Sequence, residues 1–463
     1  MKVYIENSIP EEEYIIEFIF QIIGLPFLMV SQIEDANFIY IEKGSIEINK
    51  SLKNSIIFEK CKTDVVSEYL INKSEISLGE NNIYGFDIIN AIGFFLFDEG
   101  NKNLSKDSFD EHQRLKFRNS FQFINGIADF PAVNKYILFL KKILIQRLEK
   151  KPMALYPQGK KACVILSHDV DNPGKYDHLL NYSLKPKNGG FKNYFAHYRA
   201  FIALVKTYFL DRNKNQYWVF EELMKAEKEY GFTSTSFFAS VNFQSENGHP
   251  LDVSYRLAQK KYKNIIKKLI GNGFDVGLHA SYQACLNFDS LKKEKEDLEE
   301  IAGNSVEGLR HHFWHLGKTP NETLLKHDNA GFNYDSSLAF NDHIGYRRNI
   351  ALPYFPYNKN KAERLNTLQI PVFCMDGNLF YNEKMEVEVA VNKILAQIKV
   401  IEECNGVASI DWHIRSSIPN VGRFSKWGEA YLSILEELSK REDIWVTNCG
   451  QFSDWWKDRL NLN

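Results

Sequence analysis

The 463-residue sequence has almost no net charge, no cysteine pairs and no long uninterrupted hydrophobic run. A formal net charge of −2 gives no overall footprint of nucleic-acid binding, so no nucleic-acid partner is expected. The six cysteines form no CxxC pair and have no zinc-finger spacing. We interpret them as small buried hydrophobes in a reducing compartment. They are Cys61, Cys163, Cys285, Cys374, Cys404 and Cys449.

The N-terminal segment lacks the features of a signal peptide. Acidic residues at 11–13 precede its apolar stretch, where a basic region would be expected. The stretch Ile15–Val30 contains Glu17, Gln21 and Pro26, so it is too interrupted for a membrane span. The sequence therefore favours a core helix here and a cytoplasmic protein.

The length of the chain favours two domains. Residues 1–150 contain short β-rich runs, Phe38–Ile41 and Ser55–Phe58, mixed with helical patterns. The run Ala132–Leu148 is apolar at helical spacing and is followed by Pro152, which is typical of a closing helix and a linker. We predict a smaller α+β N-terminal domain over residues 1–150, to which the sequence assigns no role.

From residue 155 to the end, short apolar runs alternate with helical stretches. This alternation predicts βα units around a parallel sheet, here a distorted (β/α)7-type barrel. Active sites of such barrels lie at the C-terminal ends of the strands. The predicted strands are Ala162–Leu166, Thr235–Ala239, Phe274–Leu278, Gly308–Trp314, Leu368–Phe373, Val407–Trp412 and Ile444–Thr447.

A basic and aromatic segment at about 173–215 interrupts this repeat. Within it, residues 185–214 have the composition of a helix that lies on an anionic membrane surface, which would place the protein at the inner membrane face. The alternative interpretation is an inserted helix that packs on the barrel or on the N-terminal domain.

Two groups of polar residues follow the first and third predicted strands of the barrel. Ser167–Asp171 comes directly after the first, and strand alternation sends Asp169 and Asp171 to the same side. Two carboxylates at a barrel mouth are tolerable when a cation lies between them or one holds a proton. His279 follows the third strand, in a position that suits a metal ligand.

Two further groups lie at later strand ends. In Gly308–Trp314, alternation groups Arg310, His312 and Trp314 on one face. A buried Arg310 needs an anion, and Asp169 would be a suitable partner. In the strand before Trp412, the same parity groups Asp411 with His413 and predicts that Asp411 orients this histidine as a general acid.

Taken together, these residues resemble the polysaccharide-deacetylase (NodB-homology) family, over about Ala162 to Trp456. The resemblance implies that Asp169 is the catalytic base, Asp171 and His279 bind the metal, Arg310 orients the base and His413 is the acid. Further segments similar to the family are Tyr230–Thr233, Ser236–Phe238, Gly331–Leu338 and Asp411–His413.

Two positions depart from the family pattern. A second metal-binding histidine is usual four residues after the first, where this chain has Gln283, and His312 replaces a usual proline. In one solution His312 supplies the missing ligand, and two histidines and one carboxylate suit a catalytic divalent metal, above all Zn²⁺. In the others Gln283 coordinates weakly, or the site has lost its metal.

The resemblance implies a hydrolase that removes N-acetyl or O-acetyl groups from a sugar. A separate N-terminal domain combined with this form of Ser167–Asp171 resembles a bacterial subgroup linked to surface-polysaccharide synthesis. Tyr282 and Trp314 are expected either to stack on the sugar or to pack in the core. The alternatives are a degenerate barrel that acts as a glycan-binding or scaffold protein, and a hydrolase of non-sugar C–N amides.

Overall fold

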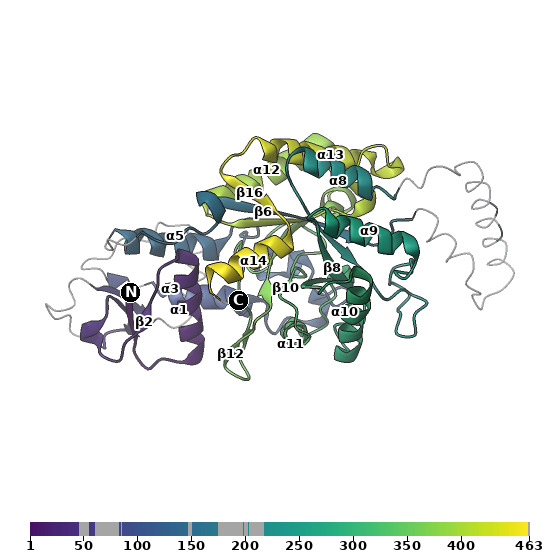
Figure 1. Ribbon diagram of the computed structural model, residues 1–463. Coiled ribbons are helices and arrows are strands. Elements are labelled where there is room, and N and C mark those ends of the chain that lie inside the picture. The colour runs from purple at the N-terminus through teal and green to yellow at the C-terminus, as the bar shows by residue number, and fades with distance from the viewer. Residues whose placement is uncertain are drawn as a thin grey trace.

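The computed structural model describes residues 1–45, 55–60, 83–84, 86–146, 151–174, 198, 202 and 217–461. It contains a five-stranded sheet in the N-terminal region and a larger curled sheet that forms a barrel (Figure 1). The basic segment at 173–215, including the membrane-surface prediction for 185–214, lies almost wholly outside the described residues.

The N-terminal sheet is parallel throughout, with helices packed against it. Its strand order is β2 (Leu28–Met29), β1 (Lys2–Ile5), β3 (Phe38–Glu42), β4 (Ile56–Lys60) and β5 (Ile83–Tyr84). The described helices here are α1 (Pro10–Ile23), α3 (Ile88–Leu96), α4 (Phe121–Ile124) and α5 (Ala132–Ile145). The expected mixture of strands and helices is present, and every strand pair of this sheet is parallel.

Local sequence explains the bounds of α1. Pro10 stands in the first turn, where a missing N–H costs nothing, and three acidic residues complement the helix dipole there. Gly24 ends the helix with φ of 80°, in the left-handed region that favours glycine. A Cβ at Gly24 would lie 2.5 Å from the carbonyl oxygen of Met153, so this position also requires close backbone approach.

The barrel sheet is parallel and has the order β13-β10-β9-β8-β7-β6-β15-β14, with β16 paired to β6. Six of the seven predicted apolar runs each correspond to one strand, the run Leu368–Phe373 is divided between two strands, β13 and β14, and β10 is additional. The two ends of the order, β13 and β14, are separated in the chain only by residues 370–371, so the polypeptide itself joins the edges of the curled sheet. The strands are β6 (Ala162–Val170), β7 (Thr235–Phe238), β8 (Asp275–Ala280), β9 (Gly308–His311), β10 (Tyr334–Asp335), β13 (Leu368–Gln369), β14 (Val372–Met375), β15 (Val407–Asp411) and β16 (Ile444–Thr447).

Helices surround this sheet, and a small hairpin, β11 (Tyr357–Asn358) with β12 (Glu363–Arg364), extends from it (Figure 1). Alternate residues of β6 belong to two cores. Ala162, Val164 and Leu166 pack in the cluster under the outer helices. Cys163 and Ile165 join the cluster that also contains the apolar faces of α1, α3 and α5. The outer helices are α8 (Phe220–Glu229), α9 (Lys260–Gly271), α10 (Phe288–Ala302), α11 (Pro320–Asn329), α12 (Val387–Glu403), α13 (Ser425–Ser439) and α14 (Cys449–Arg459).

The N-terminal region and the barrel therefore share one continuous core. Polar contacts also cross the boundary: the Tyr14 hydroxyl donates to the Phe355 carbonyl at 2.7 Å, and Arg459 donates to the Gln21 carbonyl at 2.7 Å. A shared core of this kind favours a fixed geometry between the two parts over free domain motion.

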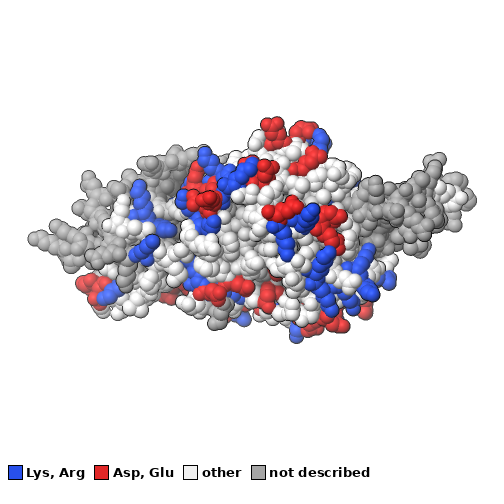
Figure 2. All heavy atoms as spheres, turned by 45° about the horizontal axis from the view of Figure 1, so that its top comes forward, with Lys and Arg blue, Asp and Glu red and all other residues white. Residues whose placement is uncertain are grey.

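The five cysteines in the described part of the chain are buried and unpaired, which confirms their interpretation as small hydrophobes. Within those residues no helix is long and apolar enough to cross a membrane. Basic and acidic side chains are intermingled on the face shown in Figure 2, in keeping with a formal net charge of −2.

Candidate metal centre

Parallel strands bring the predicted site residues together at one end of the barrel. Asp169 lies in β6 and Asp171 just after it, while His279 lies in β8 and Arg310 in β9. The register pairs Ser167 of β6 with the last residue of β15, and His279 directly with Arg310. The C-terminal ends of β6, β8, β9 and β15 thus form one polar cluster, as the barrel rule predicts.

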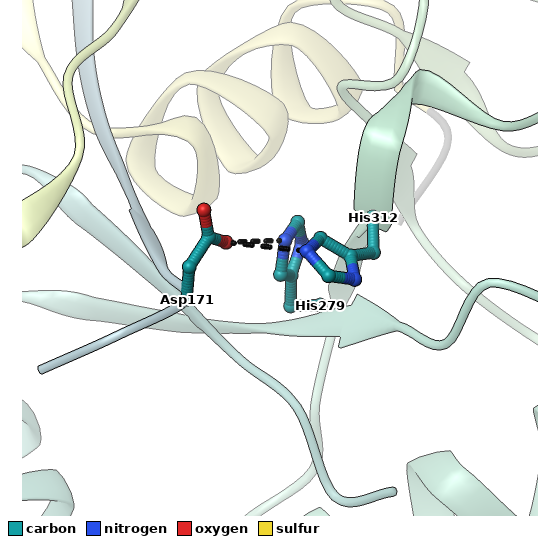
Figure 3. Close-up of side chains that lie close together, drawn as sticks. All are labelled: Asp171, His279 and His312. Carbon is teal, nitrogen blue, oxygen red and sulfur yellow. Dashed lines mark ion pairs between the residues drawn. The ribbon is translucent and has the colours of Figure 1, made fainter. Parts of the chain in front are cut away.

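Three ligand atoms converge in this cluster. Asp171 Oδ1 lies 3.2 Å from His279 Nε2 and 3.6 Å from His312 Nε2 (Figure 3). His279 Nδ1 lies 3.1 Å from the Arg310 carbonyl and donates to it, which leaves the Nε2 lone pair facing the carboxylate. Asp171 Oδ1 and His279 Nε2 are both buried and have no hydrogen-bond partner among the described residues. These two buried ligand atoms, with the imidazole of His312 beside them, fit a divalent cation.

A second group of close ligand atoms, Asp169, Asp171 and His413, overlaps the first. We favour Asp171, His279 and His312 because the other residues of the second group already have partners. Asp169 is paired with Arg310, and Nδ1 of His413 is bound by a different carboxylate. Two imidazoles and one carboxylate are also the donor set that suits catalytic zinc.

Gln283 is exposed, whereas His279 and His312 are buried. An exposed carboxamide on a turn is a poor substitute for a buried imidazole aimed at Asp171. Of the two ligands that the sequence left open, the geometry favours His312.

Arg310 holds Asp169 as the sequence predicted. The guanidinium is fully buried, and its Nη1 donates to Asp169 Oδ1 at 2.9 Å. Its other nitrogens donate to Ser167 Oγ at 2.7 Å and to the Ser336 carbonyl at 2.9 Å. Burial raises the pKa of Asp169, but the charges of His279 and Arg310 lower it below its ordinary value, so the carboxylate is ionised and able to accept a proton.

Asp411 does not orient His413, which corrects the pairing inferred from strand parity. Its Oδ1 lies 2.9 Å from Arg310 Nη1 instead, in a fully buried pair. Burial and the nearby charge of Asp169 raise the pKa of Asp411 to about 7, despite the opposing effect of Arg310. Strand parity correctly placed Asp411 on the face that points into the site. There its carboxylate pairs with Arg310 rather than with His413.

Asp376, which the sequence analysis missed, orients His413. Its Oδ1 accepts from His413 Nδ1 at 2.7 Å, and its Oδ2 accepts from the His413 backbone N–H at 3.0 Å and from Ser416. Burial lowers the pKa of His413, but Asp376 raises it well above its ordinary value overall. A signal existed, because Asp376 directly follows β14 and so stands at another strand end.

His413 Nε2 lies 3.0 Å from Asp171 Oδ2, so the imidazolium faces the metal-site carboxylate. Arg415, which the sequence also did not single out, donates to the same oxygen at 3.2 Å. Burial raises the pKa of Asp171, but His413 and His279 hold it well below its usual range overall. Asp252 accepts the backbone N–H of Tyr282 at 2.7 Å and lies 3.9 Å from His312 Nδ1. No sequence signal marked Asp252, which lies in a loop.

The two predicted sugar-stacking residues make their contacts within the protein. Trp314 is only 6% exposed and packs on the Arg310 guanidinium, 5.1 Å from the ring centroid, which leaves it little surface for a sugar. The Tyr282 ring stacks on His249 and His315 at 4.4 and 4.1 Å. We therefore assign Trp314 to support of Arg310, and Tyr282 to the rim of the site.

The turn that carries His312 is strained and is held by the N-terminal region. β9 ends one residue before His312, so the predicted strand to Trp314 is shorter than expected. Phe313 and Trp314 follow with φ of 61° and 52°, a left-handed conformation that costs about 1–3 kcal/mol for each such residue. Arg114 donates to the Phe313 carbonyl at 2.9 Å and to Asn341 at 2.7 Å, which ties this turn to the N-terminal region.

An Arg114→Ala variant is therefore expected to bind zinc about tenfold more weakly, because the turn that aims His312 loses its clamp. The measurement is competition with a zinc-binding dye on the full-length protein. Arg118→Ala, at an exposed position four residues away, is the matched control and should bind zinc as the wild type does. Equal affinity for Arg114→Ala and the wild type would contradict this role of Arg114.

Comparisons with known proteins cover the two parts of the chain separately. A family model described as a family of unknown function, DUF7033, matches residues 1–149, which is less than half of the chain. A search of curated proteins gives no match. Among solved structures, a Mycobacterium smegmatis protein assigned to the polysaccharide deacetylases is 18% identical, with a TM-score of 0.43, over 67% of this chain and 96% of its own.

Two further solved structures are similar over the same share of this chain. The Puue allantoinase is 15% identical, with a TM-score of 0.44, over 67% of this chain and 95% of its own. A CE4 family pseudoenzyme from Bacillus anthracis is 12% identical, with a TM-score of 0.33, over 67% of this chain and 71% of its own. At these values the likeness carries no argument about activity, which rests instead on the geometry of the site.

Proposed function

We propose that this protein is a metal-dependent deacetylase that removes N-acetyl or O-acetyl groups from a sugar of a bacterial surface polysaccharide or its precursor. The observation that carries the proposal is one cluster with three separate roles. Asp171, His279 and His312 offer ligands to a divalent metal, above all Zn²⁺. Asp169 offers an ionised base, and His413 offers a charged acid next to that site.

A metal in this site would polarise the acetyl carbonyl and acidify a bound water. Asp169 accepts the proton of the attacking water, because Arg310 holds the carboxylate ionised and in place. His413, charged through Asp376, gives its proton to the departing amine or alcohol. The balance is one water consumed, the C–N or C–O bond broken, and acetate and a free amino sugar or hydroxyl released.

The test is release of acetate and of free amine by the zinc-loaded full-length protein. The substrate panel contains chitin pentamer, an O-acetylated sugar and a non-sugar acetamide. Acetate from the sugars, lost on zinc chelation and restored by added zinc, would support the proposal. Turnover of the non-sugar acetamide alone would replace it with another amide hydrolase. Zinc binding without turnover of any of the three would favour a glycan-binding scaffold.

An Asp376→Asn variant is expected to lower kcat on the chitin pentamer about 100-fold, the usual scale for a lost general acid. Asparagine cannot stabilise the imidazolium of His413, so the leaving amine departs without a ready proton. Zinc content, measured in parallel, should stay at the wild-type level, because Asp376 holds no metal ligand. A variant with wild-type kcat would remove Asp376 from the mechanism.

A further inference from the structure

A large cleft lies at the surface between the N-terminal region and the barrel, beside their shared core. It has a volume of about 810 Å³ and is lined on one side by residues between 97 and 113, and on the other by residues 318–325 and 348–365. Ligand pockets commonly have volumes of about 300–1,000 Å³ and lie at domain interfaces. Neither the metal centre nor the proposed chemistry uses this cleft.

One edge of the cleft approaches the metal centre. On the barrel side, residues 318–321 follow β9 and stand toward the C-terminal ends of the strands, whereas Leu365 stands just before β13, toward their other end. On the N-terminal side, Gln113 lines the cleft. Its neighbour His112 contacts the Tyr282 hydroxyl at 2.9 Å, and its neighbour Arg114 contacts the Phe313 carbonyl at 2.9 Å. One short segment thus lines the cleft and touches the rim of the metal centre.

The wall of the cleft has an excess of positive charge. Lys106 and Lys318 are exposed in it and have no ion-pair partner among the described residues. Lys102 and Lys359 share a single carboxylate, Glu99, at 2.5 and 2.8 Å. These four lysines have one carboxylate between them, so three of their positive charges have no matching acid among the described residues.

The acids of the wall are mostly neutralised. Asp98 pairs with Arg347 at 3.0 Å, and Asp110 pairs with Arg114 at 2.7 Å. Arg348, only 4% exposed, also lines the cleft, and its Nε lies 3.9 Å from the same Asp98 carboxylate. Only Glu322 lines the cleft without a cationic partner in the part of the chain that the structure describes. The cleft is therefore suited to a negatively charged ligand.

The remaining lining suits a sugar. Half-buried rings of Phe97, Phe109 and Tyr357 offer apolar surface, on which sugar rings can pack. Carboxamides, which both donate and accept hydrogen bonds, match the hydroxyl groups of a sugar. They are Asn101, Asn103, Gln113, Asn321, Asn358 and Asn360.

We propose that this cleft is a distal binding site for acidic sugar residues, bearing carboxylate or phosphate groups, of the same polymer that is deacetylated at the metal centre. This inference rests on the proposed function, because it names the charge and the length of that substrate. It also gives residues 1–149 a role: they supply one wall of the site that selects a long, anionic chain.

The experiment measures binding by titration calorimetry to full-length Asp169→Asn, which should not turn over substrate. The probes are galacturonate hexamer, glucose 6-phosphate and the neutral chitin hexamer. We compare Lys106→Glu/Lys318→Glu with Lys267→Glu/Lys292→Glu. The control pair makes the same charge change at exposed positions of α9 and α10.

The galacturonate hexamer is expected to bind at least tenfold more tightly than the neutral hexamer. The Lys106→Glu/Lys318→Glu change should weaken binding of the acidic hexamer about tenfold, and the control pair should leave it unchanged. Glucose 6-phosphate that binds and competes with the hexamer would extend the site to phosphate. Equal binding of acidic and neutral hexamers, or equal weakening by both lysine pairs, would overturn the proposal.

Activity on the short neutral substrate separates this proposal from the proposed function. Lys106→Glu/Lys318→Glu, made in the otherwise wild-type chain, should deacetylate the chitin pentamer at the wild-type rate. Charge-selective binding without acetate release would refute the deacetylase and leave the acidic-sugar site standing. Acetate release without charge-selective binding would refute the cleft alone.

Discussion

An Asp169→Asn variant is expected to lose at least about 1,000-fold in kcat for acetate release, while it still binds zinc. Asparagine cannot accept the proton of the attacking water. Asp171, His279 and His312 are unchanged, so zinc content measured on the purified variant should equal that of the wild type. A variant that keeps more than a tenth of wild-type activity would show that Asp169 is not the base.

The Asp169→Asn fold is expected to survive because Arg310 has a second carboxylate. The charge of Asp169 is one cause of the raised pKa of Asp411, about 7. Without that charge the pKa of Asp411 falls, and Asp411 can ionise at neutral pH opposite Arg310. The guanidinium then keeps a buried partner, which avoids the large cost of an unpaired buried charge. Thermal unfolding of Asp169→Asn and the wild type at pH 7.5 checks that the loss of activity is chemical.

A His312→Ala variant is expected to bind zinc roughly 100-fold more weakly, or about 3 kcal/mol, because one of three ligands is lost. Asp171→Ala and His279→Ala should lose zinc similarly, since their donor atoms converge on the same point. Gln283→Ala is the matched control and should bind zinc as the wild type does, because that side chain is exposed. The measurements are elemental analysis and competition with a chelating dye.

The opposite pattern would be equally informative. Zinc retained in His312→Ala but lost in Gln283→Ala would move the third ligand to Gln283. A wild-type protein that takes up no zinc even when zinc is added would remove the deacetylase mechanism. The glycan-binding alternative would then become the leading interpretation of this barrel.

The sequence alone determined the residues that carry local chemistry. Strand alternation and the strand-end rule were enough to group Asp169, Asp171 and His279, because parallel strands place their C-terminal ends on one face. The buried pair of Arg310 and Asp169 followed from charge, since a buried guanidinium needs an anion. All seven predicted apolar runs contribute strands, with Leu368–Phe373 divided into two, because a run of apolar residues must be buried on both faces of a parallel sheet.

Only the tertiary structure decided which neighbours these side chains choose. Strand parity placed Asp411 on the correct face but could not show that it pairs with Arg310. It also could not show that Asp376, which follows a different strand, accepts a hydrogen bond from His413. Such pairings join residues tens or hundreds of positions apart, so no local pattern contains them. The same holds for Arg114, whose contact with Phe313 spans 199 positions and connects the N-terminal region to the metal centre. Local periodicity decides which face a side chain occupies, whereas three-dimensional packing alone decides what it meets there.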